Sequence, residues 1–339
     1  MPKADCIKKG YQSDSPFCFW FCLFHTFVFH KLENMRSVIF SISLLLLASC
    51  GNEQPKETPA AATEKPSVPA LQTTIDSIAK SVKAKVAIAS INVETGDTFY
   101  YNATDHVPTQ STIKFPLAIM IMKQVDSGKI TLDEKFTLTK DELKIRGGQT
   151  LLEALKGGNS MKVHSLLEYM THVSDNISFC GFTRYVGGGK QIQAYIKSTG
   201  LQGIGVAQRA GEPYVDFENP YNTWCTPQDM AKLMMKFYKG ELMSKTSTDT
   251  LRSIMERTTG GTKRIKGLLP EGTVVAHKTG SSDTRDGKTI AINDIGIVTL
   301  PNGQHIAMAI YVHDITGDME YGESVIAAVA KAIYNDAVK

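Results

Sequence analysis

The spacing of apolar residues predicts a helix and then a hairpin where the regular part of the chain begins. Residues 71–83 have a helical pattern of apolar and polar positions. Lys85–Val93 is rich in Val, Ile and Ala, and the turn Glu94–Asp97 leads from it into the aromatic segment Thr98–Tyr101. Two short apolar runs separated by a Gly-containing turn are typical of a β-hairpin. We therefore expect a helix followed by two antiparallel strands.

A second set of strands is expected near the end of the chain. Three apolar segments have strand-like composition and length: residues 273–281, 290–300 and 305–312. Pro301–Gly303 joins the last two across a short turn, which implies antiparallel pairing. The amphipathic segment 321–337 predicts a closing helix.

The middle of the chain is mainly helical in pattern, with Gly and Pro breaks, from Ser111 to about Thr259. Its most apolar stretch, Phe115–Met122, follows Ser111 and is closed by Asp126–Gly128, so we expect a buried helix there. These elements predict a mixed α/β (α+β) fold, in which a five-stranded antiparallel sheet is flanked by helices and carries an inserted all-helical domain. The expected division assigns the sheet part to residues 71–106 and 262–339 and the helical part to residues 107–261.

Composition limits the partners that the protein can have. The chain has 339 residues, of which 42% are hydrophobic and 21% are charged, so it can bury a sizeable core. The formal net charge is only +3 and no long basic stripe occurs, which argues against nucleic acid as a partner.

Residues 35–50 have the design of a secretory signal, with a basic start at Arg36, a short apolar core and small residues before Cys50. The segment is short for a membrane span. Its ending, Leu47–Cys50, resembles the lipobox of bacterial lipoproteins, which implies that Cys50 is acylated and becomes the first mature residue. An ordinary signal peptide with an incidental cysteine is the alternative.

The segments on either side fit that interpretation. Residues 1–34 precede Met35, where such a signal would start, and we interpret them as an over-extended N-terminus, although the aromatic run Phe17–His25 leaves a second membrane-seeking element open. Residues 51–70 are rich in Pro, Glu, Thr, Ala and Lys and predict a disordered tether. We expect a protein lipid-anchored to a bacterial membrane, periplasmic or at the cell surface, with residues 71–339 as its folded domain.

Ser111 and Lys114 stand three residues apart at the start of the buried helix, so both lie on one helical face. There the serine oxygen is near the positive end of the helix dipole, and a neutral lysine amine could take its proton. The spacing alone is weak support, because Ser77 and Lys80 share it on what we expect to be an ordinary solvated helix.

Two further motifs follow in order along the chain. Ser174–Asn176 follows an apolar helical segment, and His277–Gly280 lies on the first of the late strands. With these motifs the chain resembles a class A serine β-lactamase of the penicillin-recognising serine hydrolase superfamily. The resemblance extends over residues 71–339, includes the Gly187-Gly188 turn and the approach Arg264–Pro270, and implies a β-lactamase/transpeptidase-like fold.

The resemblance implies roles for the catalytic residues. Ser111 would be the nucleophile that opens the β-lactam amide and forms an acyl-enzyme, and Lys114 would accept its proton or belong to that relay. Ser174 would pass a proton to the leaving nitrogen, and Asn176 would bind the side-chain amide of the substrate. The backbone amides of Ser111 and Ser281 would form the oxyanion hole.

The resemblance also implies how the substrate carboxylate is held. The strand Lys278-Thr279-Gly280 would bind it through Lys278 and Thr279. An arginine near this pocket assists the lysine in the family, and Arg264 is our candidate because of its place before Lys-Gly-Leu-Leu-Pro. The alternative is an exposed loop arginine.

The residue that activates water for deacylation is a departure from the family pattern. Glu212-Pro213 followed by Asp216 resembles the Glu-Pro-x-x-Asn of the family's omega-shaped loop, so Glu212 is our candidate. A gapless count from the Ser-Asp-Asn motif instead puts Ala210 at that position. Glu218 is a weaker alternative.

Cysteine use adds two expectations for the folded domain. Cys180 stands where the family often has an Asn or Asp that braces the omega-shaped loop, so we expect this loop to be rebuilt. An oxidising compartment would permit a disulfide between Cys180 and Cys225, but the sequence leaves it open.

The leading hypothesis is the hydrolysis of penicillins and cephalosporins, which would give antibiotic resistance, by a monomer that needs no cofactor. The alternatives are a D-alanyl-D-alanine peptidase and a lipoprotein that is acylated by β-lactams without deacylating and acts as a binder or sensor. No metal site is expected, because the eight histidines include no His-x-His or His-Glu-x-x-His spacing.

Overall fold

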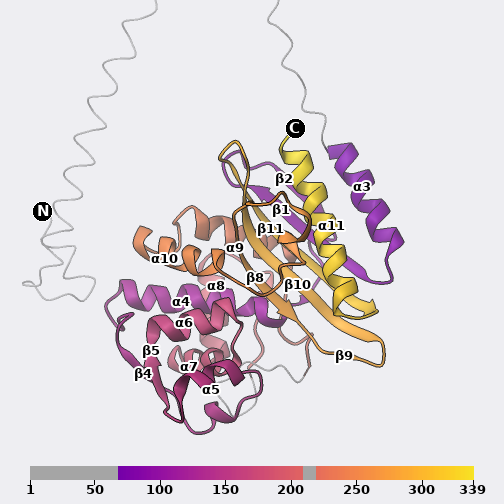
Figure 1. Cartoon of the computed structure of the whole chain (residues 1–339). Coiled ribbons are helices and arrows are strands. Elements are labelled where there is room, and N and C mark those ends of the chain that lie inside the picture. Colours follow the sequence, from indigo (N-terminus) through magenta and orange to yellow (C-terminus); the bar gives the residue numbers. More distant parts are fainter. Residues whose placement is uncertain (1–67, 209–218) are drawn as a thin grey trace, which may run out of the picture. The chain divides into compact units, whose positions relative to one another are not determined.

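The computed structural model describes residues 68–208 and 219–339, all within one unit that runs from Glu64 to Lys339 (Figure 1). The expected signal segment with Cys50 lies outside the described residues, and so do Glu212 and Glu218. The first helix begins at Val68, so the last three residues of the expected tether, 68–70, are helical.

An antiparallel sheet built from both ends of the described chain forms the scaffold, as the sequence predicts. Its strands are β1 (Lys85–Asn92), β2 (Thr98–Tyr101), β8 (Val275–Ser281), β9 (Thr284–Arg285), β10 (Lys288–Thr299) and β11 (His305–Thr316). The order is β2-β1-β11-β10-β8, and the short strand β9 pairs with β10. β8 is therefore an edge strand (Figure 1), and the chain around Ser111 packs against it at Gly280.

The register of the sheet follows from a long hairpin. β10 and β11 pair from Lys288↔Thr316 to Thr299↔His305 across the turn predicted at Pro301–Gly303. Gly303 has φ +81°, a conformation that glycine adopts without steric cost. The register brings β8 beside β10 and places Lys278 opposite Ile295.

The two faces of the sheet bury two separate cores. On β1, Val86 and Ile88 enter the core beneath α3 and α11, whereas Ala87 and Ala89 enter the core shared with the helical part. This alternation is the two-residue period of a strand. Helices α3 and α11 cover one face and the other helices lie on the opposite side (Figure 1).

The helices are α3 (Val68–Ser81), α4 (Lys114–Asp126), α5 (Gln149–Leu155), α6 (Val163–His172), α7 (Asn176–Tyr185), α8 (Gly189–Ser198), α9 (Pro227–Tyr238), α10 (Lys245–Glu256) and α11 (Met319–Ala337). The 3₁₀ helices are η1 (Gln110–Ile113), η2 (Glu142–Lys144) and η3 (Ile265–Leu268). Short strands that the sequence pattern did not predict are β3 (Val107–Pro108), β4 (Lys135–Thr137), β5 (Ser160–Lys162), β6 (Ile204–Gly205), β7 (Trp224–Cys225) and also β9, which makes the expected five-stranded sheet six-stranded in the described part of the chain.

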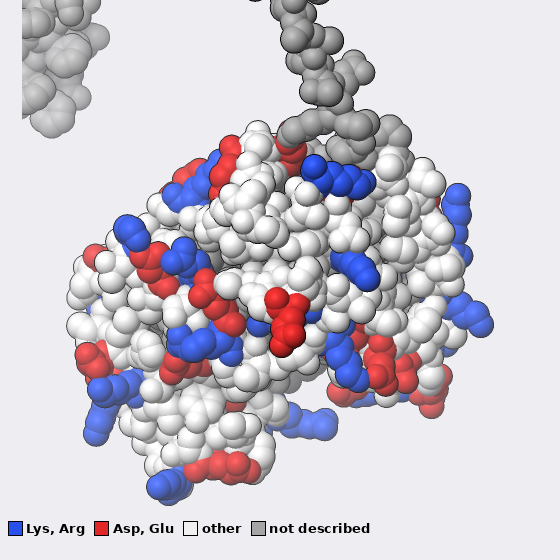
Figure 2. All heavy atoms as spheres, turned by 45° about the horizontal axis from the view of Figure 1, so that its top comes forward, with Lys and Arg blue, Asp and Glu red and all other residues white. Residues whose placement is uncertain are grey.

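On the face shown in Figure 2, acidic and basic side chains of the described residues are interspersed. Within the described ranges, none of the helices has the length and apolar content to cross a membrane. The disulfide that the sequence left open is not formed, since Cys180 on α7 and Cys225 on β7 are not bonded to each other.

Candidate active site

The sequence predicts Ser111 at the start of an α-helix, but in the structure Ser111 lies in the 3₁₀ turn η1. The α-helix begins three residues later, at Lys114. Thr112 donates from its backbone N–H to Thr109 O at 3.1 Å, which closes the turn. Gln110 has φ +47°, an uncommon value for a residue with a side chain. The predicted buried helix is confirmed, because α4 is buried from Lys114 to Met122.

Lys114 is a fully buried cation at the start of α4. Its Nζ donates to Ser174 O at 2.5 Å and to Asn176 Oδ1 at 2.6 Å, and it lies 3.2 Å from Ser174 Oγ. Burial lowers the pKa of the Lys114 ammonium to about 7, although the Asp175 carboxylate opposes the shift. A lysine with this pKa is partly neutral at physiological pH and can then accept a proton.

The Ser174–Asn176 loop between α6 and α7 supplies polar groups to this lysine. Ser174 has φ +60°, so the chain turns sharply there. Asp175 caps α7, since its side chain accepts from Ser178 N at 2.6 Å. The cap orients Asn176, whose Nδ2 donates to Arg146 O at 2.9 Å while its Oδ1 accepts from the lysine.

Strand β8 brings a second buried lysine to the same serine. Lys278 is 1% exposed, and its Nζ donates to Ser174 Oγ at 2.9 Å and to Thr279 O at 2.9 Å. Burial and then repulsion by Lys114 lower the pKa of Lys278 well below its usual value. One hydroxyl oxygen thus lies within hydrogen-bonding reach of two amines, which is a short path for a proton.

Gly280 allows β8 to approach the Ser111 turn. A Cβ at Gly280 would lie 2.8 Å from Thr109 O and 3.1 Å from Ser111 N, which is closer than side-chain carbons normally come to such atoms. The strand therefore places the backbone N–H of Ser111 beside the residue that precedes Ser281. The family resemblance predicts an oxyanion hole here, formed by the backbone amides of Ser111 and Ser281.

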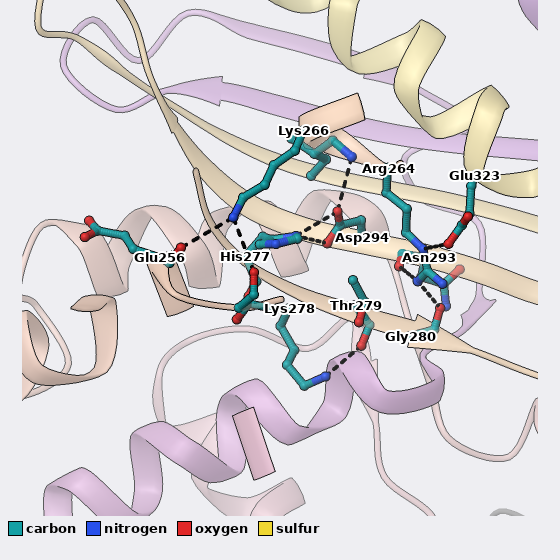
Figure 3. A network of polar contacts seen from close by, with 12 residues as sticks. Glu256, Arg264, Lys266, His277, Lys278, Thr279, Gly280, Asn293, Asp294 and Glu323 are labelled. Carbon is teal, nitrogen blue, oxygen red and sulfur yellow. Dashed lines mark hydrogen bonds and ion pairs between the residues drawn. The ribbon is translucent and has the colours of Figure 1, made fainter. Parts of the chain in front are cut away.

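Arg264 is buried behind β8, so the exposed-loop alternative is wrong. Its guanidinium donates to Gly280 O at 3.0 Å (Figure 3) and to Ser281 Oγ at 2.6 Å. Nε donates to Glu323 Oε1 at 3.0 Å, from α11. This paired cation fixes the end of β8 and keeps positive charge behind Ser281.

Two features next to the site were not anticipated from the sequence. His277 and Asp294 are both fully buried and meet at 3.0 Å behind β8 (Figure 3). Asn293 and Tyr311 face the Ser111 turn from β10 and β11. The signal for Asn293 and Asp294 was their place in an otherwise apolar strand, where polar side chains need partners.

Two candidate residues from the sequence lie outside the described part of the chain. Glu212, the candidate for water activation, lies outside the described ranges, as does the lipidation candidate Cys50. In the part of the chain that the structure describes, no group of three or more His, Cys, Asp or Glu side chains could hold a metal ion.

Known proteins are similar in sequence to this chain over most of its length. A family model described as the β-lactamase enzyme family matches residues 70–337. The extended-spectrum β-lactamase PER-1 of Pseudomonas aeruginosa is 34% identical over 306 residues, which is 90% of this chain and 96% of the relative. β-Lactamase VEB-1 of the same species is 32% identical over 263 residues, which is 77% of this chain and 88% of the relative.

Solved structures agree with the sequence relatives. The crystal structure of the TLA-1 extended-spectrum β-lactamase superposes with a TM-score of 0.76 at 38% identity and covers 80% of this chain and 100% of its own. The match of the family model spans the sheet, the helical part and every described residue of the site. The chain therefore belongs to the β-lactamase enzyme family.

Proposed function

We propose that the protein performs the β-lactam hydrolysis of its family through an acyl-enzyme on Ser111. The observation that supports this best is the pair of buried lysines, Lys114 and Lys278, whose amines both reach the hydroxyl of Ser174. A lysine with a pKa of about 7, beside a serine-bearing turn, is what activation of a hydroxyl nucleophile requires.

Acylation would proceed with one bond formed and one broken. Ser111 Oγ attacks the lactam carbonyl carbon while its proton passes to the neutral amine of Lys114. As the C–N bond breaks, the ring nitrogen takes the proton of Ser174, and that hydroxyl is refilled from the lysine. Charge that develops on the carbonyl oxygen is stabilised by the backbone amides of Ser111 and Ser281.

Substrate binding would use the residues around β8. Lys278, Thr279 and Ser281 would hold the carboxylate of the β-lactam, and Arg264 would act through its bond to the Ser281 hydroxyl. Asn176 would bind the side-chain amide, with its own position set by Lys114.

Deacylation would be catalysed by Glu212 as the base that activates water. Intact-protein mass spectrometry during exposure to benzylpenicillin tests this step in wild type and in Glu212→Gln. We expect wild type to return quickly to its free mass while the variant stays one penicillin heavier. A wild type that remains acylated for hours would contradict hydrolysis and favour a penicillin-binding protein.

We further propose that the relatives named extended-spectrum indicate the substrate range. The Gly280-Ser281 end of β8 carries little side-chain bulk, which favours room for oxyimino cephalosporins. The ratio of kcat/KM for an oxyimino cephalosporin to that for a simple cephalosporin tests this, and a ratio below about one in a thousand, roughly 4 kcal/mol of discrimination, would contradict it.

We also propose that Cys50 carries a lipid that anchors the protein to a membrane. The wild-type chain should then appear in the membrane fraction with an acylated Cys50, and Cys50→Ala should release the protein into the soluble fraction. An unmodified Cys50 in soluble wild-type protein would contradict the anchor.

A further inference from the structure

A row of residues crosses the sheet directly beneath the Ser111 turn. Gly280 on β8 pairs with Asn293 on β10, and Asn293 pairs with Tyr311 on β11. Residues paired in an antiparallel ladder place their side chains on the same face. Gly280 has no side chain at the edge of this row, so the turn lies close against the strand there, and the side chains of Asn293 and Tyr311 contact the turn from the next two strands.

Asn293 joins the sheet to the residues just before Ser111. Its Nδ2 donates to Pro108 O at 2.8 Å and to Thr109 O at 3.2 Å, and the side chain is fully buried. Its backbone oxygen accepts from Arg264 at 2.9 Å, which holds the strand at this point. One side-chain amide thus contacts two successive carbonyl groups that lie about 185 residues away in the chain.

Thr109 O is the acceptor on which the Ser111 turn begins. Thr112 donates to it from its backbone N–H at 3.1 Å and from its hydroxyl at 2.7 Å, so the Asn293 amide is a third donor. Tyr311 OH lies 3.2 Å from the Thr112 hydroxyl and supports the same turn from the next strand. These contacts hold a turn whose Gln110 is in the left-handed region.

The amide oxygen of Asn293 indicates that this residue has a positional role. Its Oδ1 is buried and, among the described residues, has no hydrogen-bond partner. Burying a polar atom without a partner costs free energy, so an apolar residue would stabilise the sheet better if packing alone mattered. What the amide supplies is a fixed position for the two carbonyl groups.

We propose that Asn293 is a positioning residue that sets the Ser111 turn against β8, and with it the Ser111 N–H that points at the developing oxyanion. The inference rests on the proposed acylation of Ser111. Asn293 does not touch the substrate and acts through the turn. Losing the amide lets the turn relax away from β8, so transition-state stabilisation falls while binding of the substrate carboxylate at Lys278 does not change.

The test compares the full chain with Asn293→Ala and Asn293→Ser. The rate constant of acylation and the non-covalent dissociation constant are measured separately, from the time course of penicillin adduct formation at several concentrations. We expect acylation to slow by about tenfold to a hundredfold, as small misplacements of catalytic groups do, with the dissociation constant unchanged within about twofold. Affinity for a boronic acid that forms a tetrahedral adduct on Ser111 should fall in parallel.

Two control variants separate positioning from stability. Asn159→Ala removes a similar amide-to-carbonyl bond, to Leu138 O, between β4 and β5. Ile333→Ala opens the core beneath α11 and lowers stability without touching the turn. Both controls should acylate at the wild-type rate at temperatures where they are folded.

The outcomes distinguish the inference from the function on which it rests. Wild type that forms no adduct on Ser111 would overturn the proposed function and the inference with it. Wild type that acylates normally, together with folded Asn293 variants that acylate within about twofold of it, would overturn the inference alone. A loss confined to the non-covalent dissociation constant would also overturn it, because Asn293 would then serve the carboxylate pocket.

Discussion

The pH dependence of acylation tests the role of Lys114 quantitatively. In water, with its ordinary pKa of 10.5, roughly one lysine in 3,000 is neutral at pH 7, whereas a pKa of about 7 makes about half of them neutral. The shift corresponds to a net cost of about 5 kcal/mol for the charged form in the site, after attraction by Asp175 has offset part of the effect of burial. The acylation rate should therefore rise about tenfold per pH unit below pH 7 and level off above it.

The assay must observe acylation without deacylation. In Glu212→Gln the adduct should accumulate, so its rate of formation with benzylpenicillin, followed by mass spectrometry or stopped flow between about pH 5 and pH 9, reports acylation alone. Wild type in the pre-steady state serves as the comparison, because Glu212 itself could contribute a titration. A profile that stays flat, or that keeps rising to about pH 10, would refute Lys114 as the proton acceptor.

Three further predictions concern stability and binding. Between about pH 7 and about pH 9 the unfolded chain binds more protons at Lys114 than the native chain does, so the free energy of unfolding should rise by about 2–3 kcal/mol, and urea unfolding that shows a fall would contradict this. Burial raises the pKa of the Cys225 thiol from 9.0 to about 12, so this thiol opposes the trend from about pH 8 upward, where it begins to ionise in the unfolded chain. Glu142→Ala should lower the free energy of unfolding by about 2–3 kcal/mol in the same measurement, because it removes the fully buried partner of Arg184. A loss under about 0.5 kcal/mol would contradict a stabilising role for this ion pair. Lys278→Ala should lower kcat/KM for a carboxylated β-lactam by about 1.5–3 kcal/mol more than for the methyl ester of the same compound, because only the carboxylate loses its charged partner, and equal kcat/KM losses for both would contradict its role.

Much of the fold follows from hydrophobic patterning. The two early strands and the three late ones lie where apolar runs and turn residues predict them, because a strand with a buried face must alternate or be apolar throughout. The hairpin at Pro301–Gly303 was predictable for the same reason. The short strands β3 to β7 were not, because two or three residues carry too little pattern to distinguish them from loops.

The site could be predicted where motifs resemble those of a known family, and less well where a contact has no such motif. Ser174 and Asn176 meet Lys114 across 60 and 62 residues, and only the resemblance implied that these motifs converge. The burial of Arg264 depends on Glu323, which lies 59 residues later on α11, and no local pattern reveals that pairing. Asn293 is similar, since its partners become visible only with the register of the sheet.

The 3₁₀ conformation of η1 shows a further limit of sequence patterns. The spacing of Ser111 and Lys114 is compatible with either helix type, since three residues make one 3₁₀ turn and nearly one α turn. We infer that two contacts favour the tighter turn: the close approach of β8 at Gly280 and the hydrogen bond from Asn293 to Thr109 O. Both are tertiary contacts, and they decide where the Ser111 amide lies.

The most direct measurement is to locate the penicillin adduct. The purified chain is mixed with benzylpenicillin, quenched within milliseconds to seconds, digested, and mapped by tandem mass spectrometry, with Ser111→Ala as the matched variant. We expect a transient adduct on Ser111 in wild type, together with hydrolysed penicillin in solution, and neither in the variant. An adduct on another residue, or hydrolysis that persists in folded Ser111→Ala, would contradict the role of Ser111 as the nucleophile.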